Sequence, residues 1–295
     1  MRRSTAILLL LLLVLLIPIE GMPSAKANVS NKSVEVSGEA SREILSTKKQ
    51  VSEEIRKGLL GRKEKIKVSM KYSALKKIQD MKTFLEEIEM EDDKTTAKDA
   101  DYLQYSIKQW HTKTSWVEGG EATITLNVIY KCSNEEEKKL DKVIKNAIKT
   151  LELTEKSDYE KVKAIHDFII NRVSYDTTLI GNSAYDALIN QSAVCEGYAM
   201  AAYRMFTEAG LEARIISGYG NGVPHAWNIV KVDGKWYNID LTWDDPVTNN
   251  GASIITYDYF LKNAKEFSDH RSNSEYRTDK FLKEYTISET SYTME

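Results

Sequence analysis

The stretch HAWNIVKVDGKWYNIDLTW, residues 225–243, decides the fold because it predicts one β-hairpin with a fixed register. Asp233 and Gly234 separate two runs rich in β-forming residues, and this dipeptide is a strong signal for a two-residue turn. In that register Val232 faces Lys235 across the turn. The other pairs follow, since antiparallel partners keep a constant sum of residue numbers.

Side chains alternate between the two faces of such a hairpin. One face carries residues typical of a core, namely Val230, Val232, Tyr237, Ile239 and Leu241. The other face presents His225, Trp227, Asp240 and Thr242. His225 and Asp240 form a diagonal pair with backbones roughly 7 Å apart, within reach of an imidazole and a carboxylate. A slip of one residue would send them to opposite faces.

A second stretch, AVCEGYAM at residues 193–200, places Cys195 at the predicted start of a helix. Apolar residues then recur at intervals of three and four, and Gly210 follows as a C-terminal stop. At a helix N-terminus the backbone N–H groups are unpaired and the dipole is positive, which favours the thiolate, the reactive form of cysteine. Position alone does not distinguish a nucleophile from an inert buried thiol.

A thiol at a helix start and a His–Asp pair on a hairpin are together the parts of nucleophilic acyl-transfer chemistry. The imidazole of His225 would take the proton of Cys195, and the carboxylate of Asp240 would orient the ring and support its positive charge. The order Cys, His, Asp along the chain matches papain-like enzymes. The alternative is a structural cysteine, a core histidine and a surface aspartate with no shared function.

These motifs resemble the transglutaminase-like superfamily, in particular its secreted bacterial members. The matching runs are SAVCEGYAMAAYRMFTEAGLEARIISGYG and HAWNIVKVDGKWYNIDLTWDDP, within a resemblance that covers about residues 152–275. It implies an α+β, papain-like core in which a helix bearing cysteine packs on an antiparallel sheet. It also implies Cys195 as the nucleophile, His225 as the base and Asp240 as the orienting carboxylate.

The resemblance further implies an oxyanion hole made by the backbone N–H of Cys195 and one other donor. Three residues are candidates for that donor: Gln191, Tyr185 and Trp227. Asn228 is an alternative structural hydrogen-bonding residue, and the run WDDP at 243–246 is typical of a turn. His166 is expected to be a helix histidine with satisfied hydrogen bonds, whereas His111 and His270 have no predicted partner.

The first residues of the chain have the pattern of a secretory signal peptide. Arg2 and Arg3 precede an apolar run, and Ala25-Lys26-Ala27 offers small residues for cleavage. We therefore expect residues 1–27 to direct export to the cell surface or beyond. An uncleaved segment would instead be a membrane anchor.

The remaining residues suit one large or two modest domains. We expect a flexible leader at 28–40, an N-terminal α+β domain at 41–151 and a transglutaminase-like catalytic domain at 152–295. The elements predicted for the N-terminal domain are helices at 41–60 and 75–88, strands at 65–72, 102–111 and 122–130, and a helix opened by a capping box at Ser133–Glu136. This domain contains no motif that indicates chemistry.

Composition excludes some classes of partner and cofactor. The net charge of −3 gives no reason to expect nucleic-acid binding, which needs a basic surface. The sequence has no CxxC, HExxH or DxDxDG pattern, so we expect no metal and no cofactor. Cys132 and Cys195 are the two cysteines. Export makes a disulfide between them an open alternative, but we expect Cys132 to be a structural, half-buried thiol.

The sequence thus predicts an exported, cysteine-dependent enzyme that acts on amide bonds of proteins or peptides, including cell-wall-associated ones. A thioester on Cys195 would be resolved by an amine in a transglutaminase or by water in a peptidase or amidase. The choice between transfer and hydrolysis stays open. The alternative from another class is a non-catalytic binding module on a transglutaminase-like fold.

Overall fold

The structure, a computed structural model, describes residues 44–92, 94–246 and 254–293. The predicted signal peptide and leader, residues 1–40, lie outside these ranges. Within the ranges, no helix has both the length and the apolar character that crossing a membrane requires.

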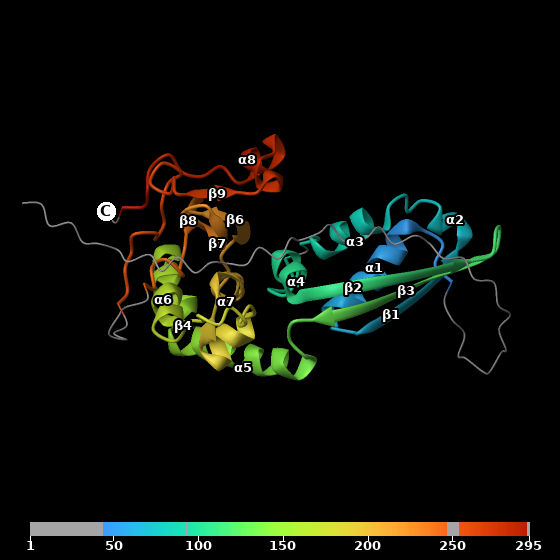
Figure 1. The fold of residues 1–295 in the computed structure, drawn as a ribbon, viewed down its shortest axis with the longest axis horizontal. Coiled ribbons are helices and arrows are strands. Elements are labelled where there is room, and N and C mark those ends of the chain that lie inside the picture. The colour runs from blue at the N-terminus through green and yellow to red at the C-terminus, as the bar shows by residue number, and fades with distance from the viewer. Residues whose placement is uncertain (1–43, 93, 247–253, 294–295) are drawn as a thin grey trace, which may run out of the picture. The chain divides into compact units, whose positions relative to one another are not determined.

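The first part of the chain builds a three-stranded antiparallel sheet in the order β1-β3-β2 (Figure 1). Its elements are α1 (Lys48–Leu60), β1 (Lys65–Lys71), α2 (Tyr72–Leu75), α3 (Met81–Glu89), α4 (Ala100–Ser106), β2 (Ile107–Trp116) and β3 (Glu121–Tyr130). Alternate residues of β1 and β3 are buried in one cluster with α1 and α3, as the two-residue period of a half-buried strand requires. The predicted strands at 65–72 and 122–130 are confirmed.

The predicted strand at 102–111 is wrong in its first half, because residues 100–106 form helix α4 and β2 begins at Ile107. In the helical turn, neighbouring side chains point in different directions and make different contacts. Tyr102 packs in the core of the second part, Leu103 packs in that of the first part, and Asp101 binds Arg214. A strand could not direct three consecutive side chains in this way.

Two predicted helices differ in their bounds. The helix expected from residue 41 begins at Lys48, after Thr47 and Gln50 form a capping box. The helix expected at 75–88 is split into α2 and α3, because Asp80 caps a new helix by accepting the backbone N–H of Thr83.

The second part contains a four-stranded antiparallel sheet in the order β8-β7-β6-β9. Its elements are α5 (Asn134–Thr150), η1 (Leu153–Glu155), α6 (Asp158–Ile170), β4 (Ser174–Tyr175), the π-helix η2 (Asp186–Asn190), β5 (Ser192–Ala193), α7 (Cys195–Glu208), β6 (Ala213–Gly220), β7 (Val223–Val232), β8 (Lys235–Ile239), β9 (His270–Ser272), η3 (Ser274–Arg277) and α8 (Asp279–Glu284). The capping box that opens α5 is confirmed.

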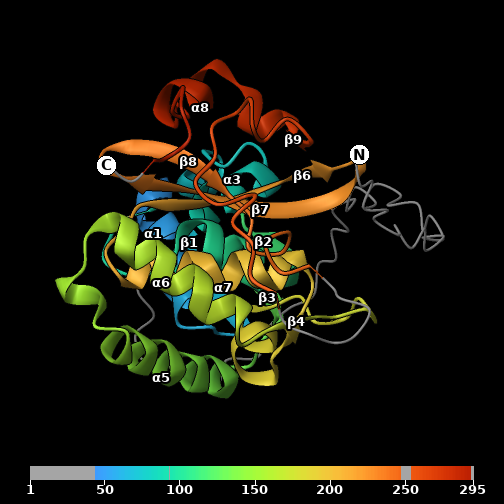
Figure 2. The same ribbon diagram turned by 90° about the vertical axis from the view of Figure 1, so that its left-hand side faces the viewer.

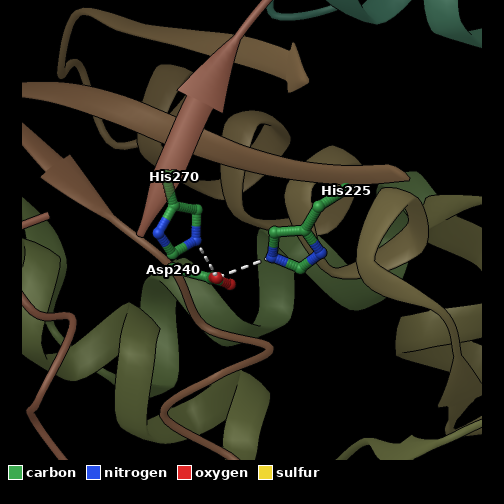
Figure 3. Close-up of side chains that lie close together, drawn as sticks. All are labelled: His225, Asp240 and His270. Carbon is green, nitrogen blue, oxygen red and sulfur yellow. Dashed lines mark hydrogen bonds and ion pairs between the residues drawn. The ribbon is translucent and has the colours of Figure 1, made fainter. Parts of the chain in front are cut away.

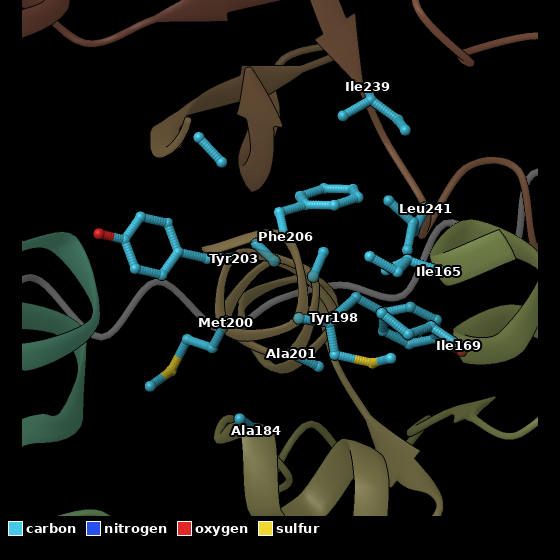
Figure 4. Packing of buried hydrophobic residues seen from close by; sticks show 14 of the residues in the cluster. Ile165, Ile169, Ala184, Tyr198, Met200, Ala201, Tyr203, Phe206, Ile239 and Leu241 are labelled. Carbon is cyan, nitrogen blue, oxygen red and sulfur yellow. The ribbon is translucent and has the colours of Figure 1, made fainter. Parts of the chain in front are cut away.

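Helix α7 lies at the centre of the main core. It is buried along nearly its whole length, and its side chains Tyr198 and Phe206 pack among residues of α6 and of the segment that includes β8 (Figure 4). Asn228 of β7 ties the helix to the sheet, because its amide donates to the carbonyls of Ala199 and Arg214 at 3.1 and 3.2 Å. The expectation that Asn228 is a structural hydrogen-bonding residue is confirmed.

Both faces of the four-stranded sheet are covered. Helices α6 and α7 lie on one face, and the C-terminal segment with α8 lies on the other (Figure 2). A cluster on this second face contains Ile216, Trp227, Ile229, Trp236 and Phe267. The hairpin face that carries His225 and Asp240 is therefore largely removed from water.

Glu137 of α5 joins elements from both parts of the chain. Its buried carboxylate accepts from Arg62 after α1 and from Arg204 of α7, each at 2.6 Å, and from the hydroxyl of Tyr102 at 2.9 Å. Helix α5 also contributes Leu140 and other residues to the main core. The domain boundary near residue 152 stays a prediction.

Replacing Glu137 by Gln should lower the free energy of unfolding by about 3–5 kcal/mol, because two guanidinium groups lose a shared buried carboxylate and Arg204 keeps only Asp141 as an ionic partner among the described residues. Urea unfolding of the full chain measures this change. Glu135 is exposed in the same first turn of α5, so Glu135→Gln matches the charge and helix-dipole change without the buried contacts. Equal unfolding midpoints for the two variants would contradict the importance assigned to Glu137.

Candidate active site

Cys195 is the first residue of α7 and is half-buried. The N-cap residue, Val194, offers no side-chain acceptor, so it leaves the first-turn N–H groups uncapped. Gly197 lets the neighbouring loop approach closely, since a Cβ there would lie 2.7 Å from Ala193 and 3.0 Å from the carbonyl oxygen of Ser183. The prediction that the thiol sits in the first turn of a buried helix is confirmed. Cys132 is buried, and both thiols are free rather than joined in a disulfide.

The hairpin that carries His225 has the predicted register. Val232 pairs with Lys235 and Asn228 with Ile239, and both Asp233 and Gly234 have positive φ, as a type I′ turn requires. The residues expected on the core face all belong to the main core cluster.

His225 and Asp240 meet on the other face of the hairpin. The ring Nε2–H of His225 donates to Oδ2 of Asp240 at 2.7 Å (Figure 3). The other carboxylate oxygen of Asp240 accepts the backbone N–H groups of Thr242 and Trp243. These three hydrogen bonds fix the carboxylate, which in turn fixes the plane of the His225 ring.

Burial of both groups would disfavour their charged forms, but their mutual attraction is stronger. Burial alone would lower the pKa of His225, whereas the charge and hydrogen bond of Asp240, with a smaller contribution from Cys195, raise this pKa to about 10. Burial would raise the pKa of Asp240, but the charges and hydrogen bonds of His225 and His270 lower it to about 2. The pair therefore carries opposite charges around neutral pH.

Cys195 completes this arrangement from α7. Its side chain is close enough to His225 for a hydrogen bond that raises the pKa of the imidazole. Because Nε2 of His225 is bound to Asp240, the remaining ring nitrogen, Nδ1, is left for the sulfur; in Figure 3 it points away from the carboxylate. The structure brings together the three residues that the sequence predicted.

His270 is a fourth member of the cluster that sequence reasoning missed. Its Nε2 lies 3.0 Å from Oδ2 of Asp240, the same oxygen that His225 binds, and its Nδ1 lies 2.8 Å from Oδ1 of Asp269 (Figure 3). It is 30 residues beyond Asp240 in the chain and on a short strand, so no local periodicity predicts the contact. The weak signal was the dipeptide Asp269-His270, an acid beside a histidine.

Tyr175 of β4 is a second residue that the sequence did not single out. Burial raises the pKa of its phenol, and the nearby negative charges of Cys195, Asp176 and Asp240 raise it further. The half-buried phenol of Tyr175 therefore lies within the electrostatic reach of the Cys195 thiol.

The three predicted candidates for an oxyanion donor are found in different surroundings. Trp227 is buried beside the His225 ring, with a centroid distance of 6.2 Å, and its indole N–H has no partner among the described residues. Tyr185 is half-buried against the main core. Gln191 is exposed and lines a surface hollow with Asp167 and Arg172. Their roles as donors stay predictions.

The run at 243–246 does more than form a turn. Asp244 accepts from the buried His166, whose Nε2 lies 3.1 Å away, and Asp245 accepts the hydroxyl of Tyr198 of α7 at 2.6 Å. The other ring nitrogen of His166 lies 3.0 Å from Asp167. These contacts confirm that His166 is a satisfied helix histidine, and they anchor the segment after Asp240 to α6 and α7.

His225, Asp240 and His270 are also the one group of described side chains close enough together to hold a metal ion. The two nitrogen–oxygen distances of 2.7 and 3.0 Å are those of hydrogen bonds. Ligand atoms on a tetrahedral zinc ion would lie about 3.3 Å apart. The geometry is therefore that of a hydrogen-bonded chain, and we assign no metal ligands here.

The part of the chain that contains this site is similar to known proteins. Residues 145–241 match the family model described as Transglutaminase-like superfamily, a range that includes Cys195, His225 and Asp240. The kyphoscoliosis peptidase of Mus musculus is 31% identical over 121 residues, covering 35% of this chain and 18% of the mouse protein. The human kyphoscoliosis peptidase is 30% identical over 137 residues, covering 39% of this chain and 21% of the human protein.

The chain thus spans about a fifth of the length of these curated relatives. A solved structure described as a TGase superposes with a TM-score of 0.36 and 20% identity, covering 64% of this chain and 53% of the other. The second part has a mixed α+β, transglutaminase-like core, with the cysteine helix packed on an antiparallel sheet. The predicted fold class is confirmed.

Replacing Asp240 by Asn should lower the pKa of His225 well below its value of about 10, because the buried imidazolium then loses its counter-charge. Since the pKa of His225 is raised and that of Asp240 is lowered, the pair stabilises the fold fully between about pH 4 and 6.5; this contribution is lost as the pH rises through about 10 or falls through about 2. Side-chain NMR titration of His225 measures the change. His166, which contacts other carboxylates, serves as the internal control; a His225 titration that does not move would contradict the assignment.

Proposed function

We propose that the chain is an exported cysteine-dependent enzyme that forms a thioester on Cys195 from an amide bond of a protein or peptide. The single observation that carries the proposal is the imidazole of His225, held between the buried carboxylate of Asp240 and the thiol at the start of α7. The match to the Transglutaminase-like superfamily over residues 145–241 supports the same class of reaction.

In the acylation step, Cys195 reacts as a thiolate whose proton is held on the imidazolium of His225, and the sulfur attacks the carbonyl carbon of the substrate amide. The carbon–sulfur bond forms, and the negative charge moves to the carbonyl oxygen, next to the uncapped first turn of α7. The carbon–nitrogen bond then breaks, and the imidazolium of His225 gives its proton to the departing ammonia or amine. The product is a thioester on Cys195.

In the second step, an amine or a water molecule attacks the thioester. His225 takes a proton from the attacking group, the carbon–sulfur bond breaks, and the thiolate is regenerated. An attacking amine gives a new amide, the transglutaminase outcome, whereas water gives a carboxylic acid. Both related proteins are named peptidases, which favours water as the acceptor.

The proposed location is outside the cytoplasm or at the cell surface, on the grounds of the signal-like pattern of residues 1–27. The proposed partners are protein or peptide substrates there, including cell-wall-associated ones. The mildly acidic net charge of −3 gives no support to a nucleic-acid partner.

A non-catalytic binding module is the competing proposal. It does not require an ionised histidine held beside a thiol. Burying an ion pair of this kind costs desolvation energy, which a binding module would have no reason to spend. The pair therefore favours the enzyme over the binding module, because catalytic acids and bases need shifted pKa values.

Iodoacetamide near neutral pH should label Cys195 at least about tenfold faster in the wild type than in His225→Ala, because His225 favours the thiolate. Mass spectrometry of each cysteine peptide measures both rates. Burial raises the pKa of the Cys132 thiol, so Cys132 is the slow internal reference. Wild-type Cys195 that reacts no faster than a model thiol would favour the binding module.

Incubation of the full chain with a glutamine peptide and a fluorescent amine should give a covalent product that distinguishes the two acceptors. Amine incorporation indicates transfer, whereas cleavage or deamidation without incorporation indicates hydrolysis. Cys195→Ser should abolish either reaction, and Cys132→Ser should leave it intact as the matched control. Activity that persists in Cys195→Ser would end the proposed mechanism.

A further inference from the structure

Asp240 receives two histidines on one oxygen atom. His225 of β7, an interior strand, and His270 of β9, an edge strand, approach Oδ2 at 2.7 and 3.0 Å from either side of the carboxylate (Figure 3). Oδ1 is already taken by two backbone N–H groups, so the carboxylate cannot turn to offer each histidine its own oxygen. A change in the charge or hydrogen bonding of His270 therefore alters the same oxygen atom that His225 binds.

The sheet is built to bring β9 to this position. Gly218 of β6 pairs with Ser272, and a Cβ at Gly218 would lie 2.7 Å from the Cα of Ser272. Gly220 pairs with His270, and a Cβ there would lie 2.7 Å from Trp243 and 3.2 Å from the His225 ring. Two glycines thus leave the room in which both imidazoles reach Asp240.

The His270 ring is held on all sides. It stacks on Phe267 at a centroid distance of 3.9 Å and packs against Trp243 at 4.3 Å and Trp227 at 5.0 Å. Its side chain is 1% exposed. A ring enclosed in this way cannot rotate to exchange its partners for water. Its two hydrogen bonds therefore determine which of its nitrogens carry a proton.

Both ring nitrogens of His270 face carboxylates. Nε2 faces Asp240 and Nδ1 faces Asp269, whose other oxygen accepts the hydroxyl of Tyr259 at 2.7 Å. An ionised carboxylate only accepts hydrogen bonds, and a neutral imidazole has a single N–H. Two such contacts require a proton on each nitrogen.

We infer that His270 is an imidazolium and acts as a positioning residue that works through Asp240 on His225. This inference rests on the proposed function and extends the predicted triad by one side chain. His270 lies beyond residue 241, where the family match ends. It contacts neither the substrate nor the sulfur in the proposed mechanism; its effect is on the carboxylate.

Two consequences follow for His225. The second hydrogen bond holds the Asp240 carboxylate in one orientation, which keeps the His225 ring aligned with Cys195. The positive charge of His270 also offsets part of the Asp240 charge, so that His225 releases its proton more readily to the leaving amine. The hydrogen-bonded row of His270, Asp240 and His225 is surrounded by four other charged or titratable groups: Cys195 of α7, Tyr175 of β4, Tyr259 and Asp269.

Two variants of the full chain separate these effects. His270→Gln keeps a donor toward Asp240 but removes the charge, whereas His270→Phe fills the site but removes both. In His270→Gln the His225 titration, measured by side-chain NMR, should move to higher pH, with KM near the wild-type value. In His270→Phe kcat should fall about 10- to 100-fold below that of His270→Gln, because the carboxylate loses its orientation.

A His225 titration in His270→Gln that matches the wild type would overturn the inference, as would equal kcat values for the two variants. His166 is again the internal control for the titration. If the wild type turns over no substrate, the proposed function fails, but the NMR titration still tests His270. Thermal unfolding of both variants separates lost positioning from lost folding, and His270→Gln keeps the test valid if His270→Phe does not fold.

Discussion

The buried carboxylate of Asp240 is the constraint on which the candidate site depends. A charged group that is 1% exposed must have all its hydrogen bonds satisfied, or the fold loses several kcal/mol. Four donors meet this demand: two backbone N–H groups just beyond β8, one imidazole from β7 and one from β9. One side chain thereby fixes the relative positions of three segments.

The same need for satisfied polar groups holds the thiol in place. The first turn of α7 packs tightly against the loop at 181–183, and Asn228 pins the middle of the helix to the sheet. Asp245 binds Tyr198 of α7, and Asp244 binds His166 of α6. Hydrogen bonds thus join the helices to the sheet both at β7, which carries His225, and at the segment after Asp240. Preorganised catalysis needs such rigid support.

Much of the site could be predicted from the sequence because it depends on local rules. The turn at Asp233-Gly234 sets the hairpin register, and the register alone puts His225 and Asp240 on one face. The small and apolar periodicity after Cys195 sets the start of α7. His270 could not be predicted in this way, since its position depends on the pairing of β9 with β6 across Gly218 and Gly220, far away in the sequence. Helix α4 was mistaken for a strand because its side chains serve two cores, which no single-element pattern describes.

The most direct test of the account is a double-mutant cycle between Asp240 and His225, read out as the rate of Cys195 alkylation near neutral pH. The wild type, Asp240→Asn, His225→Ala and the double variant are compared. We predict strong coupling: once His225 is absent, removing Asp240 changes the rate little, because the carboxylate acts on the sulfur through the imidazole. Independent effects that multiply in the double variant would contradict it.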